Sequence, residues 1–226
     1  MAPTPPARGF PNKIQKPAAE ASAAAGSRPG GRSARVRAQV LEAAGLQLVE
    51  HGYDALTVDA VAERAGVHRT TVYRRWRDVG GLLADLLDSA ADDAWRPADT
   101  GSLEGDLTAM NQEILEAVVA EPSLTTALVA ASFRSAEAAR ALRAFWAGRY
   151  ERSAEVVERA GARGEVPPGT VPRPLLVAAT APLFHELVLL GTDPDPALPA
   201  RAARAAALAA RAGAFTGPPP GGVDPR

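Results

Sequence analysis

A run of hydrogen-bond donors between residues 68 and 75 carries side chains of the kind that recognise nucleic acids. The run comprises His68, Arg69, Thr70, Thr71, Tyr73, Arg74 and Arg75. Arginine can donate two hydrogen bonds to a guanine edge, and a threonine methyl can pack against thymine. Tyrosine and arginine also donate to phosphates, which positions a protein on DNA without reading its sequence. On an isolated helix the same residues are more simply a solvated face, so the elements that hold them decide their meaning.

The apolar spacing around this run predicts three short helices. The first runs from Arg32, with Ser33 as its N-cap, to His51. The second begins after Thr57 as N-cap and buries one face; that face is formed by Val58, Val61, Ala62 and Ala65. A tight turn at Gly66 separates it from the third, which runs from about Arg69 to Trp76. This arrangement is typical of a helix-turn-helix, in which the start of the third helix faces base edges in the major groove.

Residues 44–83 strongly resemble the DNA-binding domain of the tetracycline-repressor (TetR) family of regulators. The matching features are Gly52-Tyr53, Thr57, Val61-Ala62, Ala65-Gly66-Val67, Thr71, Val72-Tyr73, Trp76 and Leu82. The resemblance implies that the second helix starts near a phosphate, as its dipole would favour. One position departs from the family pattern. The family usually has a phosphate-binding lysine just inside the fourth helix, where this chain has Val79 followed by two glycines.

Longer helices are expected beyond the fourth helix, which Asp78 would cap. They are predicted over residues 103–118, 122–129, 136–159, 173–190 and 198–215. The predicted fold is therefore all-α. It has a disordered basic arm at 1–31, a helix-turn-helix domain at 32–78, a helical ligand-binding and dimerisation domain at 79–216 and a disordered tail at 217–226.

The last two long helices are expected to form a homodimer. Residues 159–170 and 181–191 resemble one group of TetR regulatory domains, which implies that these helices pair with their symmetry mates. The nearly continuous apolar run from Leu175 to Leu190 independently requires cover, by the chain itself or by a partner.

Side chains of the larger domain could also line a pocket for a small hydrophobic effector. The candidates are Met110, Ile114, Phe145, Trp146, Tyr150, Phe184 and His185. Core packing is the alternative for each residue. Trp146, Tyr150 and His185 are the better candidates because each adds a polar group to an apolar body.

Composition narrows the class of protein. The net charge is −1, yet residues 1–37 carry seven basic side chains and one acidic one. A basic N-terminal segment on an otherwise acidic chain favours a local contact with a polyanion; the alternative is that the segment only increases solubility.

The chain has no cysteine, and we expect no metal site and no cofactor. No stretch approaches the roughly 20 apolar residues of a membrane helix, and the N-terminus lacks a secretory core, so a cytoplasmic location is expected.

These features predict a DNA-binding transcriptional regulator, with repression relieved by a small apolar ligand as the default. An enzyme is disfavoured because His51, His68 and His185 are scattered and no catalytic arrangement is apparent. The main alternative is a helical protein-interaction module whose helix-turn-helix no longer binds DNA, and Val79 is its only support.

Overall fold

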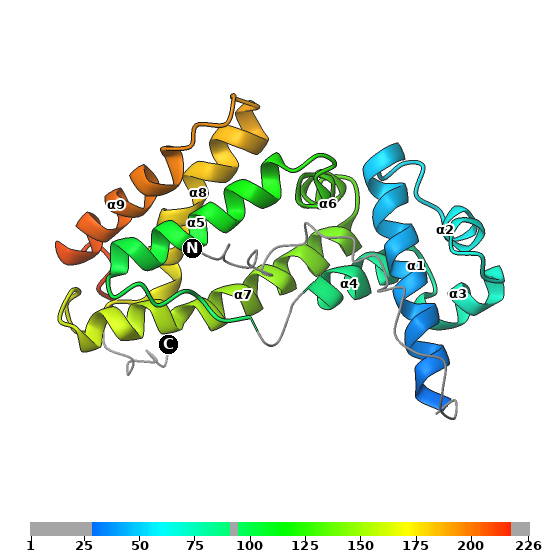
Figure 1. Ribbon diagram of the computed structural model, residues 1–226, viewed down its shortest axis with the longest axis horizontal. Helices are drawn as coiled ribbons and strands as arrows, with labels where there is room; N and C mark the ends of the chain where they lie inside the picture. The colour runs from blue at the N-terminus through cyan, green and yellow to red at the C-terminus, as the bar shows by residue number, and fades with distance from the viewer. Residues whose placement is uncertain (1–28, 91–94, 218–226) are drawn as a thin grey trace, which may run out of the picture. The chain divides into compact units, whose positions relative to one another are not determined.

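The computed structural model describes residues 29–90 and 95–217, and these residues are helical without a named strand. The helices are α1 (Pro29–His51), α2 (Val58–Arg64), α3 (Arg69–Trp76), α4 (Val79–Ala90), α5 (Leu103–Val119), α6 (Leu124–Ser132), α7 (Ala136–Ala162), α8 (Pro172–Phe184), the π-helix η1 (His185–Leu190) and α9 (Leu198–Arg211). Figure 1 shows their order along the chain. The all-α prediction is confirmed.

The described residues fall into two compact units. One contains residues 29–90 and 120–145, and the other contains residues 95–119 and 146–217. Helix α7 belongs to both, with its first ten residues in the former unit. The predicted domain boundary at residue 78 does not coincide with this division, because α4 packs with α1 and α3.

The unit that contains the helix-turn-helix is built around α1. Helices α2 and α4 pack on α1, and α3 packs on both α2 and α4. Its buried side chains include Val40, Leu48, Val61, Val72 and Leu82, each with no exposed surface or almost none. Val61 belongs to the apolar face that the sequence spacing predicts for the second helix.

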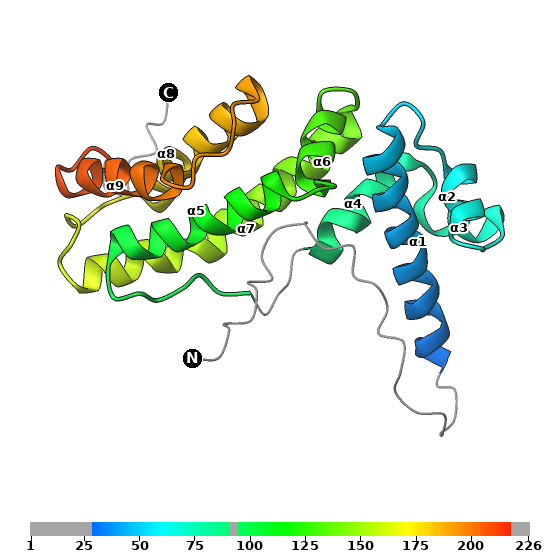
Figure 2. The ribbon, with the colours of Figure 1, turned by 45° about the horizontal axis from the view of Figure 1, so that its top comes forward.

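The other unit is a layered helical bundle. Helix α9 packs on α5 and α8, and α5 also packs on α8 (Figure 2). Alanines on the inner face of α9 permit a close approach, since a methyl group adds little thickness; they are Ala203, Ala206, Ala207 and Ala210. The buried Asn111 of α5 donates its amide to the backbone carbonyls of Ala179 and Pro199, at 3.0 and 3.1 Å.

Several predicted helix ends are wrong. Helix α1 begins at Pro29, so Ser33 lies inside it and is not its N-cap. Residues 31–35 are exposed, and apolar periodicity cannot locate a helix end that packs against nothing. Helix α6 begins at Leu124 and not at Pro122, because the Ser123 hydroxyl caps it by accepting from the Thr126 amide at 3.1 Å. Helix α9 ends at Arg211, before Gly213 takes a positive φ of 80°.

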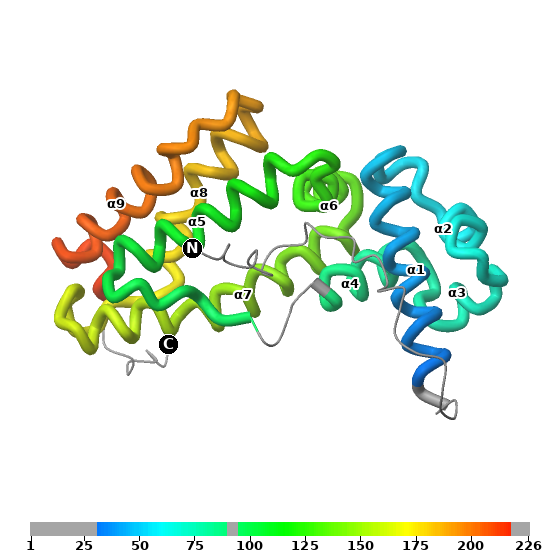
Figure 3. Tube along the Cα trace, in the orientation of Figure 1, coloured from blue at the N-terminus to red at the C-terminus, as the bar shows by residue number. Residues whose placement is uncertain are grey.

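The predicted helix over 173–190 is two elements. Helix α8 contains Pro182, which lacks an amide donor. The π-helix η1 follows α8, and Gly191 ends η1 in the left-handed conformation. Figure 3 shows the Cα trace running on from α8 into the segment that leads to α9. Together, Pro172–Leu190 is a run of 19 residues with mean hydropathy 1.3, long and apolar enough by composition to cross a membrane. The run is not apolar throughout, because it contains Arg173, His185 and Glu186. Core helices of soluble proteins have the same character, so this single run is weak evidence for a span.

The predicted basic arm and C-terminal tail lie mostly outside the described residues. Arg37, one of the basic side chains counted at that end, lies within α1 and pairs with Asp85 of α4.

Candidate nucleic-acid interface

Thr57 fixes the start of α2, as the sequence predicts. Its hydroxyl accepts a hydrogen bond from the Ala60 amide at 3.1 Å, and its own backbone is extended. Asp59 follows in the first turn, where the helix dipole favours an anion. Val58, Val61 and Ala62 are buried while Thr57 is exposed, so the start of α2 points away from the core.

The turn between α2 and α3 depends on Gly66. Its φ is +65°, in the left-handed region that other residues rarely adopt. The Val67 amide then donates to the Ala62 carbonyl at 3.0 Å, which closes the turn. Val67 is half-buried and lies at the edge of the core.

His68 is the N-cap of α3, a role that the sequence reasoning missed. Its Nδ1 lies 3.4 Å from the Thr70 amide and 2.9 Å from the Thr70 hydroxyl. Histidine is an uncommon cap, so residue type gave no signal. The ring remains exposed, and capping therefore does not withdraw it from the surface.

Helix α3 divides into a buried side and a donor-rich side. Val72 is fully buried and Trp76 is 6% exposed. The other side carries the exposed residues Arg69, Thr70, Tyr73, Arg74 and Arg75, with Thr71 half-buried at its edge. Within the described part of the chain, no carboxylate pairs with Arg69 or Arg74. These guanidinium groups are therefore available to an external anion.

Arg75 has internal partners. Its guanidinium carbon lies 5.3 Å from the Trp76 ring centroid, and its Nε lies 3.9 Å from Oδ2 of Asp85. Asp85 also accepts from the Trp76 indole and from Arg37 of α1. Sequence reasoning did not single out Asp85, since its partners lie nine and 48 residues away.

The junction after α3 has an unusual backbone. Arg77 has a φ of 65°, which is rare for a residue with a Cβ atom. Asp78 then caps α4 as predicted, accepting from the Gly81 amide at 2.8 Å. Val79 is half-buried in the first turn of α4, and the exposed Arg77 is the nearest cation in sequence to this position.

In the other unit, part of the predicted ligand set comes together. The Trp146 ring lies 5.6 Å from Tyr150 and 5.2 Å, edge-on, from Phe184. The Tyr150 hydroxyl lies 3.3 Å from the Thr180 hydroxyl. Met110 and Ile114 are buried in the helical core, and His185 is exposed. Phe145 is buried but belongs to the unit that contains the helix-turn-helix.

A surface groove of about 700 Å³ lies elsewhere in this unit, along the end of α7 and the loop that follows it. Its lining includes Val157, Glu165, Val166 and Arg211 and none of the predicted ligand residues. The contacts among Trp146, Tyr150 and Phe184 do not test the prediction of an effector site beside them.

A buried ion pair lies in the same unit as the aromatic cluster, and the sequence did not reveal it. Arg149 donates to Glu113 at 2.9 Å, and its guanidinium lies 3.1 Å from the Trp95 ring centroid. Only 3% of the Arg149 side chain is exposed. Burial lowers the pKa of Arg149 to about 9, and burial raises the pKa of Glu113 against the pull of Arg149.

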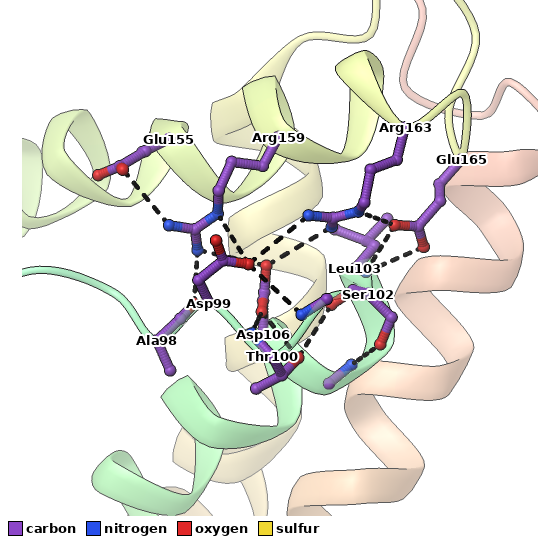
Figure 4. A network of polar contacts seen from close by, with 12 residues as sticks. Ala98, Asp99, Thr100, Ser102, Leu103, Asp106, Glu155, Arg159, Arg163 and Glu165 are labelled. Atoms are coloured by element: carbon purple, nitrogen blue, oxygen red, sulfur yellow. Dashed lines mark hydrogen bonds and ion pairs between the residues drawn. The ribbon is translucent and has the colours of Figure 1, made fainter.

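A larger network joins the start of α5 to the end of α7 (Figure 4). Asp106 is fully buried and accepts from the Thr100 amide at 2.6 Å and from Arg159 at 3.3 Å. Arg163 bridges Asp106 and Glu165, and Glu165 accepts from the Leu103 amide at 2.9 Å. Each of these carboxylates pairs with an arginine, so the network ties the start of α5 to the end of α7.

Two family models match separate parts of the chain. Residues 40–86 match the model described as bacterial regulatory proteins of the tetR family. Residues 97–206 match the model described as the tetracyclin repressor-like C-terminal domain.

Relatives and solved structures point the same way. The HTH-type transcriptional regulator AqdR of Rhodococcus erythropolis is 35% identical over 181 residues, covering 78% of this chain and 86% of AqdR. The uncharacterised regulator YdeS of Bacillus subtilis is 41% identical over 68 residues, covering 30% of this chain and 34% of YdeS. The crystal structure of the TetR family regulator SCO0332 superposes with a TM-score of 0.60 at 28% identity, covering 76% of this chain and 97% of that one.

Proposed function

Because the chain belongs to the TetR family of transcriptional regulators, we propose that it is a homodimeric repressor that a small apolar ligand releases from a pseudo-palindromic operator. The DNA-binding helix-turn-helix and the regulatory role belong to the family, and the chain is accordingly not an enzyme. The observation that carries the proposal is the exposed donor side of α3, held by a buried Val72 and Trp76.

The donors of α3 divide by position into two roles. Arg69, Thr70 and Thr71 stand in its first turn, where side chains reach base edges. Tyr73, Arg74 and Arg75 lie further along and contact phosphates. Thr57 and His68, the caps of α2 and α3, stand at helix N-termini, whose dipoles favour a phosphate.

Dimerisation through α8, η1 and α9 is supported by apolar side chains left uncovered within one chain. Val177, Leu189, Leu190 and Leu208 are 39–64% exposed. Only 28% of the most apolar stretch of Pro172–Leu190 is buried. Apolar surface of this kind marks an interface, and a second copy covers it.

The effector is proposed to bind beside Trp146. That ring, Tyr150 and Phe184 supply an apolar surface, and the hydroxyls of Tyr150 and Thr180 supply polar groups. Ligand sites commonly combine an apolar lining with few polar groups. A ligand that prefers one arrangement of the dimer shifts the population away from the DNA-binding arrangement. A cytoplasmic location follows from the proposed access to DNA.

A mobility-shift assay on the DNA that flanks the gene tests the proposal. Purified full-length protein should retard that DNA and should be displaced by unlabelled copies of it more readily than by unrelated DNA. Equal displacement by both competitors would favour the alternative, a helical interaction module that has lost DNA recognition.

A further inference from the structure

The Asp85 carboxylate of α4 collects hydrogen bonds from two other helices. The Trp76 indole, in the last turn of α3, donates to it at 2.7 Å. Arg37 of α1 donates through Nε at 3.0 and 3.1 Å and also through Nη2. A single side chain thus joins α1, α3 and α4, and it lies at the end of α3 opposite to the base-reading residues.

The Asp85 carboxylate also interacts with two arginines, the less exposed Arg37 and the more exposed Arg75. Arg37 is 30% exposed and is held by several hydrogen bonds, whereas Arg75 is 46% exposed and lies 3.9 Å away. Burial would raise the pKa of Asp85, but hydrogen bonds from Arg37 and Trp76 outweigh it and the pKa is lowered. Asp85 is therefore ionised at neutral pH and partly neutralises Arg75.

These two roles act on different parts of DNA binding. The hydrogen bond to the Trp76 indole fixes the orientation of α3 relative to α4. Specific contacts from the first turn of α3 to base edges require that orientation to be fixed. Neutralising Arg75 weakens its attraction to any phosphate, and phosphate attraction is independent of sequence. One residue can thus raise operator binding relative to binding of other DNA.

We propose that Asp85 is a positioning residue for sequence discrimination, which holds α3 through Trp76 and restrains the phosphate-seeking charge of Arg75. The proposal rests on the DNA-binding role proposed above. Without the Asp85 charge, Arg75 gains freedom to contact phosphates, and the hydrogen bond from Trp76 that ties α3 to α4 loses its charge-assisted strength. Affinity for unrelated DNA should rise while preference for the operator falls.

The test compares Asp85→Asn with Asp88→Asn in the full chain. Asp88 lies on the same helix, 3.9 Å from Arg37, but its side chain is 82% exposed, so the control removes the same charge without the tie. The probe is a duplex that the wild-type protein selects from randomised DNA, with a scrambled duplex beside it. Both dissociation constants are measured by fluorescence anisotropy over a range of salt.

Asp85→Asn should bind the scrambled duplex several-fold more tightly and lose about tenfold in the ratio of operator to scrambled affinity. Its log affinity should become steeper in log salt by a fraction of a unit per half-site, because Arg75 recovers the part of its charge that Asp85 neutralises. Asp88→Asn should keep the wild-type ratio. Equal changes in both variants would reduce the effect to net charge and overturn the proposal. So would a parallel loss on both duplexes that tracks a fall in melting temperature.

The substitution Trp76→Phe separates the effect of the Trp76–Asp85 hydrogen bond from the effect of the Asp85 charge on Arg75. It removes the indole donor, keeps an aromatic ring and leaves every charge in place. Operator preference should fall while scrambled affinity and the salt slope stay unchanged. Full retention of preference overturns the proposal even where Asp85→Asn fails to fold. A wild-type protein that selects no duplex refutes the proposed function itself, which is a different result.

Discussion

A Cβ atom on Gly81 would overlap the backbone carbonyl oxygen of Trp76. The first turn of α4 therefore approaches the end of α3 more closely than any side chain at this position permits. At the preceding residue, a Cβ atom on Gly80 would lie 2.5 Å from Cβ of Glu137, at the start of α7. The two glycines that follow Val79 thus serve close helix packing.

Replacing Gly81 with alanine should destabilise the protein by about 1–3 kcal/mol, because backbone must move to admit the methyl group. Gly161, in the last turns of α7, is the matched control, since a Cβ atom there meets nothing within 4 Å. Gly161→Ala should be neutral or stabilise by up to about 1 kcal/mol. Urea unfolding of both variants makes the comparison, and equal stability of the two would refute the close-packing account.

The buried ion pair makes a second prediction. Glu113→Gln leaves the Arg149 guanidinium buried without its counter-charge and should cost about 3–5 kcal/mol of unfolding free energy. Replacing both partners, as Arg149→Met with Glu113→Leu, should recover most of that loss because no charge remains buried. Chemical denaturation measures each variant. A double variant as unstable as Glu113→Gln would show that the pair stabilises through packing and not through charge.

The exposed apolar side chains of η1 and α9 should form the dimer interface. Leu189→Arg places an unpaired charge there and should yield monomers, since burying it costs several kcal/mol. Leu189 is 64% exposed within one chain, so a substitution there disturbs the fold of the single chain less than one at the half-buried Leu187. Phe133→Arg is the control, at a residue that is 75% exposed and follows α6. Light scattering should show a wild-type dimer at micromolar concentration; a wild-type monomer contradicts the proposed assembly.

An apolar effector should stabilise the protein and quench Trp146. At a hundredfold excess over its dissociation constant, a ligand adds about 2.7 kcal/mol of stability. A panel of hydrophobic compounds is screened by melting temperature, and hits are titrated by tryptophan fluorescence. Trp146→Phe should abolish the quench, because the other tryptophans are Trp76 and Trp95. A quench that survives this substitution places the ligand elsewhere.

The elements that position the donors were largely predictable from sequence. The predicted bounds of α3, from Arg69 to Trp76, agree with the structure because two buried residues and a glycine turn fix them locally. The caps Thr57 and Asp78 were predictable for the same reason, since a cap acts within three residues.

Features that depend on distant partners or on uniform composition were not predictable. The break between α8 and η1 falls in a run that is apolar on nearly every side. The spacing of apolar residues in such a run does not indicate where one helix ends and the next begins. Asp85 appeared to be an ordinary polar residue of α4, because its partner Arg37 is 48 residues away. The pairing of Arg149 with Glu113 spans 36 residues and has no local signature.

The central claim is that the donor side of α3 reads DNA sequence, and a salt titration of binding tests it most directly. Wild type, Arg69→Ala and Arg75→Ala are titrated by anisotropy on a selected duplex and on its scrambled counterpart. Arg69→Ala should lose about 1–3 kcal/mol on the selected duplex only. Arg75→Ala should weaken both duplexes alike and flatten the salt dependence by about one unit per half-site. A wild-type protein that binds both duplexes equally would contradict the account.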